Sequence, residues 1–280
     1  MEKTLSNIKL IVVHGGFTSH QDERIACGLA YMAGARVRIE RRDPTQDELN
    51  DPDILVMDVG MKYSPLDRNF DHHQLTAQDG ETPETAYSLL AKDLKVEEAM
   101  EALYPWYTTG RWVDVKGPFK AAEICGAEWP KIEGFMGPSE HLNAQKWAQN
   151  DMFRHDLSQE YATAWETEIS AFLDYKDMPN LEEHNGLRVI FTDHITDKGF
   201  RAVSLPIAKY HRADVLVGRD DRGGGLSIMR LGDSVPVDFR LVQDDPSVGF
   251  VHKDSGFILK TIAGVTSREA AFNLIEKSIK

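Results

Sequence analysis

The amino-acid sequence predicts an α/β protein, with a parallel-sheet domain in its N-terminal part and a smaller α/β domain at its C-terminal end. Two observations predict this class. Short apolar runs alternate with helical segments within the first sixty residues, and a second set of strand-like segments follows residue 186. Of the 280 residues, 41% are hydrophobic and 28% are charged. Each domain can therefore bury its own core, and a disordered chain is excluded.

Four segments define the N-terminal domain. The apolar run Ile8–Val13 predicts a buried strand, and Asp22–Ala33 has apolar residues at helical spacing with acidic residues in its first turn. Ala35–Arg41 alternates as a strand does, and Ile54–Asp58 is another buried strand. This order is typical of a largely parallel sheet, in which the strands end at one common edge.

The middle of the chain is predicted to be mostly helical. Thr85–Leu94 and Val96–Leu103 have the pattern of helices, and Ala144–Tyr175 predicts a long connecting helix. Pro105–Pro138 contains several prolines and glycines and is predicted to be loop-rich. Lys176–Gly186 combines proline, Asn-Gly and acidic residues, and we interpret it as the domain boundary.

The C-terminal domain is predicted from short strands. The strand-like segments are Arg188–Thr192, Phe200–Leu205, Val215–Val217, Leu226–Arg230 and Phe257–Lys260. Arg222–Gly225 favours a hairpin turn over a phosphate-binding loop, and Thr266–Glu269 has the form of a capping box ahead of a last helix. We expect a first domain over residues 1–145, a connecting helix and linker over 146–186, and a second domain over 187–280.

The composition also bears on the surroundings of the protein. The net charge is −13, from 32 basic and 45 acidic residues, so most of the surface should repel nucleic-acid phosphates. No apolar run approaches the roughly 18 residues that a membrane span needs, and the opening residues lack the apolar segment of a secretory signal. With only Cys27 and Cys125 as cysteines, a cytoplasmic location is expected.

Three groups of metal-type ligands follow the predicted strands. The first is His14, His20 and Asp22, the second is Asp58, and the third is Asp71-His72-His73. Each alone is more often an ordinary polar loop, but together they occupy the edge of the sheet where α/β proteins bind ligands. Carboxylate and imidazole together suit Mn²⁺, Fe²⁺, Co²⁺ or Zn²⁺, and two such ions can activate water for attack on a phosphate.

These motifs resemble a known family. Asp71-His72-His73 after a strand-ending aspartate resembles the DHH phosphoesterase superfamily. More narrowly, VHGGFTSHQDE, MDVGMKYSP and NFDHHQ resemble the melanocyte proliferating gene 1 family of exonucleases. GFVHKDSGFI and TSREAA near the C-terminus resemble two further motifs of that family. The resemblance touches both ends of the chain and implies a DHH-type N-terminal domain, with the active site in the cleft between the two domains.

The chain departs from the family pattern at several points. Five residues separate His14 from His20, where the family has four. DVGM replaces D-V-G-G, and an extra Asp254 splits the histidine-serine-glycine motif. The family's V-D-A-I-D-N-G segment has no clean copy. Asp114, in Trp112–Gly117, is the favoured counterpart, and Asp151 is the competitor.

The resemblance implies roles for individual residues. His14, His20 and Asp58 would hold one metal ion. Asp22, Asp58, His72 and Asp114 would hold the second, with Asp58 as the bridge. Asp71 would accept from an imidazole N–H and fix its orientation, and His73 would face the phosphate. The residues expected to bind the rest of the substrate are His252, Lys253, Ser255 and Gly256.

The expected function is metal-dependent phosphodiester hydrolysis with two divalent ions, most simply Mn²⁺. Asp58 and His73 would be the catalytic residues, and the substrate would be the end of single-stranded RNA or DNA, or a short oligonucleotide. A small-molecule phosphoesterase or pyrophosphatase is the first alternative, and a non-catalytic metal-binding partner protein is the second. No membrane association is expected, and a homodimer remains open.

Overall fold

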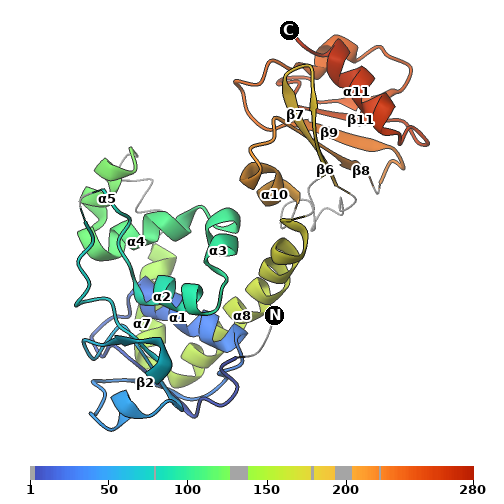
Figure 1. Ribbon diagram of the computed structural model, residues 1–280. Coiled ribbons are helices and arrows are strands. Elements are labelled where there is room, and N and C mark those ends of the chain that lie inside the picture. Colours follow the sequence, from blue (N-terminus) through green and yellow to red (C-terminus); the bar gives the residue numbers. More distant parts are fainter. Residues whose placement is uncertain (1–3, 79, 127–137, 178–179, 193–203, 221) are drawn as a thin grey trace. The chain divides into compact units, whose positions relative to one another are not determined.

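The computed structural model describes residues 4–78, 80–126, 138–177, 180–192, 204–220 and 222–280. The chain forms two compact units, Met1–Ser170 and Ala171–Lys280. Each unit contains one sheet with helices, so the mixed α/β class predicted from the sequence is confirmed. Figure 1 shows the elements of both units. No helix within the described ranges is long and apolar enough to cross a membrane.

The sheet of the first unit has the strand order β2-β1-β3-β5-β4. Neighbouring strands pair in parallel from β2 to β5, and β4 is an antiparallel edge strand. The strands are β1 (Leu10–Val13), β2 (Ile39–Arg41), β3 (Ile54–Met57), β4 (Tyr63–Ser64) and β5 (Asn69–Phe70). Because β1, β3 and β5 are parallel, the residues that follow them emerge at the same edge of the sheet.

Helix α1 (Gln21–Met32) follows β1, as the sequence predicts, and every residue after Gln21 is buried. Its burial depends partly on a glycine. A Cβ atom at Gly28 would lie 2.8 Å from side-chain atoms of both Trp165 and Tyr161 in helix α8 (Asp151–Tyr175). The absent side chain therefore lets α8 pack closely against α1, which fixes the helix that carries Asp22.

The prediction that Pro105–Pro138 is loop-rich was wrong for its first part. Helices α4 (Trp106–Lys116) and α5 (Pro118–Ile124) occupy it, and residues 127–137 lie outside the described ranges. Pro105 is the N-cap of α4, and Pro118 opens α5 after Gly117. Proline is tolerated at these helix starts because its missing N–H would have no intrahelical partner there. The prolines mark helix starts here.

The other predicted helices are found with one difference. Helices α2 (Ala86–Asp93) and α3 (Glu97–Leu103) lie where the sequence places them, and Thr85 forms a capping box with Ser88. The predicted helix Ala144–Tyr175 is two helices, α7 (Pro138–Gln149) and α8. Asn150 separates them, because its side-chain oxygen accepts from the Phe153 amide and caps the start of α8.

The sheet of the second unit has the order β10-β11-β9-β8-β7-β6. Only β7 and β8 pair in parallel, and the other neighbours are antiparallel. Its strands are β6 (Asn180–His184), β7 (Leu187–Thr192), β8 (Val215–Arg219), β9 (Leu226–Arg230), β10 (Val248–Val251) and β11 (Ile258–Thr261), and its helices are α10 (Leu205–Tyr210) and α11 (Arg268–Lys277). Leu274 and Ile275 of α11 pack into one core with Val217 and Ile228 of the sheet.

Several details of the second unit correct the sequence predictions. Strand β6 lies inside the segment interpreted as a linker, and Asn185-Gly186, both with positive φ, form its hairpin turn. Leu205 begins α10 instead of ending a strand, while residues 200–203 lie outside the described ranges. Ser267, not Thr266, caps α11. The hairpin prediction for Arg222–Gly225 was confirmed, because β8 and β9 are antiparallel neighbours on either side of it.

Candidate metal centre

The predicted metal ligands of the first unit lie on loops at the carboxyl edge of its sheet. His14 directly follows β1, Asp58 directly follows β3, and Asp71 directly follows β5. His20 is the N-cap of α1, so the chain returns to the same edge before the helix begins. The parallel arrangement of the strands thus brings together residues separated by more than fifty positions in the sequence.

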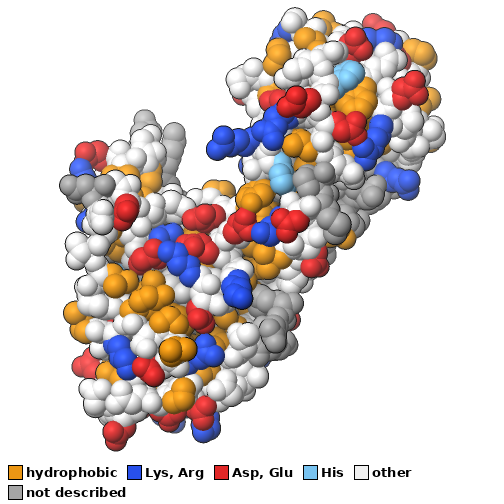
Figure 2. All heavy atoms as spheres, in the orientation of Figure 1, with side chains coloured by type: hydrophobic (Ala, Val, Ile, Leu, Met, Phe, Trp, Pro, Cys, Tyr) orange, Lys and Arg blue, Asp and Glu red, His pale blue; other side chains and the backbone are white. Residues whose placement is uncertain are grey.

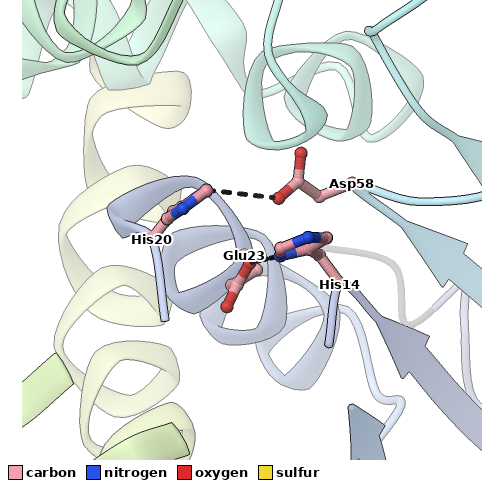
Figure 3. Close-up of side chains that lie close together, drawn as sticks. All are labelled: His14, His20, Glu23 and Asp58. Carbon is pink, nitrogen blue, oxygen red and sulfur yellow. Dashed lines mark ion pairs between the residues drawn. The ribbon is translucent and has the colours of Figure 1, made fainter. Parts of the chain in front are cut away.

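A first group consists of His14, His20, Glu23 and Asp58. One ligand atom from each residue lies within 4.8 Å of the others. His14 Nδ1 is 3.9 Å from Glu23 Oε2, and His20 Nδ1 is 4.0 Å from Asp58 Oδ2. Figure 3 shows these side chains converging from the loop after β1, from α1 and from the end of β3. The four residues could hold one metal ion.

Three atoms of this group are buried and make no hydrogen bond: His14 Nδ1, Glu23 Oε2 and Asp58 Oδ2. Leaving a polar atom buried without a partner is costly, most of all on an ionised carboxylate. A cation bound between the three atoms would replace the missing partners. The donor set therefore fits a divalent metal ion that prefers mixed nitrogen and oxygen ligands.

A second group is centred on His72. Its Nε2 atom lies 3.2 Å from Asp58 Oδ1, 3.4 Å from Asp22 Oδ2 and 3.4 Å from Asp114 Oδ2. Asp58 thus directs Oδ1 toward this group and Oδ2 toward the first one. A carboxylate placed in this way can bridge two neighbouring metal ions.

The pKa values of the group reflect crowded negative charge. Burial, followed by the charge of Asp58, raises the pKa of Asp22, Glu23 and Asp114, most strongly for the first two. Burial also raises the pKa of Asp58, but the hydrogen bond from His72 and the charges of His72 and His73 outweigh it, so the net shift is downward. Burial lowers the pKa of His72, but its hydrogen bond to Asp58 and the nearby carboxylates raise it overall. A divalent cation would relieve this repulsion.

The backbone at Asp58 has an uncommon conformation. Its φ angle is 58°, and Gly60 and Met61 follow with φ of 99° and 53°. The left-handed region is disfavoured for residues with a Cβ atom, although aspartate and asparagine tolerate it better than most. The Asp58 amide donates to the Phe70 carbonyl at 3.2 Å, which ties the turn to β5. Such strain is concentrated at functional sites, and here it falls on Asp58, the residue that faces both groups.

Asp22 is held by the start of another helix. Its two carboxylate oxygens accept from the amides of Ala86 and Tyr87, each at 2.8 Å. These amides lie in the first turn of α2, where helix N–H groups lack intrahelical partners and the dipole favours negative charge. The bonds fix the carboxylate of Asp22 while one of its oxygens faces His72.

Asp71 holds one of the two adjacent histidines, and that histidine is His73. Asp71 Oδ1 accepts from the His73 amide at 2.9 Å and lies 2.7 Å from His73 Nδ1. Asp71 Oδ2 accepts from the Met61 amide at 2.6 Å. The His73 side chain is 48% exposed, whereas that of His72 is 9% exposed. His73 is therefore the member of the pair that a substrate can reach.

The structure separates the two candidates for the fourth motif. Asp114 lies on α4 and contributes to the group around His72. Asp151, at the start of α8, has an 86% exposed side chain and pairs with Arg154. Asp114 therefore has the position of a ligand, and Asp151 has the position of a surface residue.

This difference predicts the effect of removing each charge. Asp114→Asn should weaken Mn²⁺ binding at the second group by at least the roughly 10- to 100-fold that loss of even an outer-shell partner costs, whereas Asp151→Asn should leave it unchanged. Calorimetric titration of both variants with Mn²⁺ measures the effect. Weakened binding in Asp151→Asn alone would show that the fourth motif had been aligned wrongly.

Glu23 is the member of the centre that sequence reasoning missed. The signal was the adjacent pair Asp22-Glu23 in the first turn of α1. Consecutive helical residues point about 100° apart, so the two carboxylates face different groups. Asp22 reaches the group around His72, and Glu23 reaches the group with His14 and His20.

A pocket of about 220 Å³ borders the centre. His20, Asp22 and Asp114 belong to its polar part together with Thr18, Ser19, Gln21 and Arg24, and the rest of the wall is small or apolar. Its lining residues are Thr18, Ser19, His20, Gln21, Asp22, Arg24, Tyr87, Gly110, Val113, Asp114, Pro118 and Ala144. The volume is below the roughly 300–1,000 Å³ of pockets that enclose drug-sized ligands, so the pocket suits one small group.

The predicted substrate-binding block of the second unit forms the turn between β10 and β11. His252 Nδ1 lies 2.9 Å from Ser255 Oγ, and Lys253 is exposed. Gly256 is buried with φ of 58°, and a Cβ atom there would lie 2.1 Å from Asp238 Oδ1. The turn thus requires glycine at this position, and it presents His252, Lys253 and Ser255 beside one another.

Comparison of the chain with protein-family models and with curated proteins gives no match. The inferences about function therefore depend on the geometry of the centre and on the sequence motifs that form it.

Proposed function

We propose that the protein is a metal-dependent phosphodiesterase that hydrolyses the ends of single-stranded nucleic acids or short oligonucleotides. The observation that carries the proposal is the position of Asp58, which directs one oxygen toward each of two adjacent groups of imidazole and carboxylate ligands. A pair of bridged metal ions supplies an activated water and neutralises charge on both oxygens of a phosphoryl displacement. The proposal includes a DHH-type arrangement of the first unit.

The donor set favours a transition metal. Both groups combine imidazole nitrogen with carboxylate oxygen, whereas Mg²⁺ and Ca²⁺ prefer oxygen ligands alone. Mn²⁺ suits carboxylate-rich sites and accepts imidazole. His14, His20, Asp58 and Asp22, His72, Asp114 would hold the two ions, with Asp58 common to both.

His73 is proposed to act on the substrate. Asp71 fixes its ring through Nδ1, and its side chain is half exposed beside Asp58, with Nδ1 3.9 Å from Asp58 Oδ1. With Nδ1–H donating to Asp71, Nε2 is the free ring atom, and in the imidazolium form it can donate to a phosphoryl oxygen. A donor fixed in this way stabilises the charge that develops in the transition state.

The pocket beside the centre favours an organic substrate over inorganic pyrophosphate. Tyr87, Val113 and Ala144 contribute apolar surface within it, and inorganic pyrophosphate has no apolar group that could use such a wall. A base or sugar attached to the scissile phosphate could be buried there. The same pocket is compatible with a small-molecule phosphoesterase, which stays the second candidate.

The charge distribution favours short substrates. The net charge is −13, and on the face seen in Figure 2 acidic and basic side chains are interspersed. Affinity for long nucleic acids depends on many contacts between basic side chains and phosphates. The protein is therefore proposed to act on strand ends and oligonucleotides, with His252, Lys253 and Ser255 binding the remainder of the strand.

The test compares substrates in the presence of Mn²⁺. We expect hydrolysis of single-stranded oligonucleotides and of a small chromogenic phosphodiester, but not of pyrophosphate. His252→Ala should keep its metal content and lose about tenfold more kcat/KM on the oligonucleotide, which corresponds to about 1.4 kcal/mol of lost positioning energy. Equal losses of kcat/KM on both substrates would show that the turn with His252 has a structural role. Preference for pyrophosphate would contradict the phosphodiesterase proposal.

A further inference from the structure

Glu23 is a buried carboxylate for which the sequence motifs provide no role. Its side chain is fully buried in the first turn of α1. Oε1 accepts from the Arg41 guanidinium at 3.1 Å. Oε2 is buried without a hydrogen-bond partner and lies 3.9 Å from His14 Nδ1. One oxygen is therefore held by a cation of the protein, and the other faces the first group.

We propose that Glu23 is a ligand of the first metal ion, and that Arg41 holds it in the ligating orientation. The inference rests on the proposed two-metal function and adds a residue to it. Without Glu23, the first ion would have two neutral imidazoles and a share of Asp58. The second ion would have Asp22 and Asp114 in addition to its share of Asp58. Glu23 supplies the first ion with a carboxylate of its own and reduces this imbalance of charge.

Arg41 also fixes the loop that carries both histidines. Its Nη1 donates to the Gly16 carbonyl and its Nη2 to the Thr18 carbonyl, each at 2.9 Å. Both carbonyls lie between His14 and His20, where the chain has one residue more than the family pattern. The Arg41 side chain is 6% exposed, and its guanidinium lies 5.8 Å from the ring centroid of Trp147. One buried arginine thus connects the loop and Glu23, as its planar fork of donors allows.

Glu23 could instead orient His14 without contacting the metal. A carboxylate that accepts from the second N–H of a ligating imidazole is common at metal sites. The structure favours direct ligation, because Asp58 Oδ2 is also buried without a hydrogen-bond partner, and the ligand atoms of Glu23, Asp58 and the two histidines lie within 4.8 Å of one another. The two roles predict different results for Glu23→Gln. Its single amide oxygen can accept from either Arg41 or His14 but not from both, and the amide is a much weaker metal ligand than the carboxylate.

The experiment measures metal binding to the full chain. Wild type, Glu23→Gln and the control Glu84→Gln are titrated with Mn²⁺ by calorimetry, and visible absorption spectra are recorded with Co²⁺. Glu84 is a suitable control because its carboxylate also pairs with a buried arginine, Arg111. We expect two ions in wild type and in the control. In Glu23→Gln one ion should bind at least about tenfold more weakly, and the Co²⁺ spectrum should change for that ion only.

The outcomes separate the two proposals. Two ions with wild-type affinities and spectra in Glu23→Gln would overturn the role of Glu23 and leave the two-metal function intact. Weaker binding with an unchanged Co²⁺ spectrum would assign Glu23 to the orientation of His14, which also overturns the inference. No metal binding in wild type would overturn both proposals. If Glu23→Gln does not fold, Glu23→Asp keeps the charge but withdraws the carboxylate by one methylene, and an unchanged affinity in that variant would contradict the inference.

Discussion

Asp58→Asn is expected to lose both metal ions and to lower the rate of phosphodiester hydrolysis by several orders of magnitude. The reason is that its two oxygens face two different groups, so a single change removes a ligand from each. Asparagine is the appropriate replacement because the residue has a φ of 58°, which asparagine tolerates and alanine does not. Elemental analysis and turnover in the presence of Mn²⁺ measure the effect.

A matched control for Asp58→Asn is Asp67→Asn. Asp67 lies in the same unit, but its carboxylate is partly exposed and contacts Lys62 and Ser64. That variant should retain two ions and full turnover. A normal metal content in Asp58→Asn would contradict the bridging role and, with it, the two-metal centre.

His72→Ala and His73→Ala are expected to fail in different ways. His72 Nε2 lies within 3.4 Å of three carboxylates and is nearly inaccessible, so its loss should empty the second group. His73 is half exposed and is held by Asp71, so its loss should leave both ions bound and lower kcat on the order of a hundredfold. Metal content and kcat of the two variants distinguish these effects.

Each of these two variants serves as the control for the other, because the two residues are adjacent and chemically identical. Equal loss of metal from both would show that His73 is a ligand instead of a group that acts on the substrate. Unchanged metal content in His72→Ala would remove the second group from the centre. Asp71→Asn should resemble His73→Ala in milder form, because it loosens the orientation of that ring.

The sheet of the first unit could be predicted because its signal is local. Ile11, Val12 and Val13 form an apolar run between a polar start and His14-Gly15, and all three are fully buried. Apolar runs of this length between polar segments are typical of parallel strands covered on both faces. Helix α1 likewise combines apolar residues at helical spacing with acidic residues in its first turn, and the structure has a helix at this position.

The elements that the sequence did not predict depend on features that a local apolar pattern does not show. Helices α4 and α5 were obscured because Pro105 and Pro118 were read as loop residues, although both stand at positions where a helix accepts proline. The break between α7 and α8 depends on one hydrogen bond of Asn150, which a periodic pattern cannot reveal. Strand β6 has little apolar character and owes its place to pairing with β7.

The residues of the candidate centre could likewise be predicted only in part from the sequence. The motifs indicate His14, His20, Asp22, Asp58 and His72, because metal-type residues after strands are visible in the sequence. Asp114 required a choice between two segments, and only the folded position of α4 separates it from Asp151. The sequence shows Glu23 beside Asp22, but its contacts with Arg41 and His14 are seen only in the folded chain, because these partners come from two different strand ends.

The gathering of four carboxyl groups in one unit has a consequence for folding itself. Asp22, Glu23, Asp58 and Asp114 come together only in the native chain, so a cation that binds them binds the folded state and not the unfolded one. Such a ligand adds about 2.7 kcal/mol of stability when present at a hundred times its Kd. Ala171–Lys280 contributes none of these four carboxyl groups and gains no such stabilisation from them. Removal of a bound metal is therefore expected to lower the free energy of unfolding of the first unit and to leave that of Ala171–Lys280 unchanged.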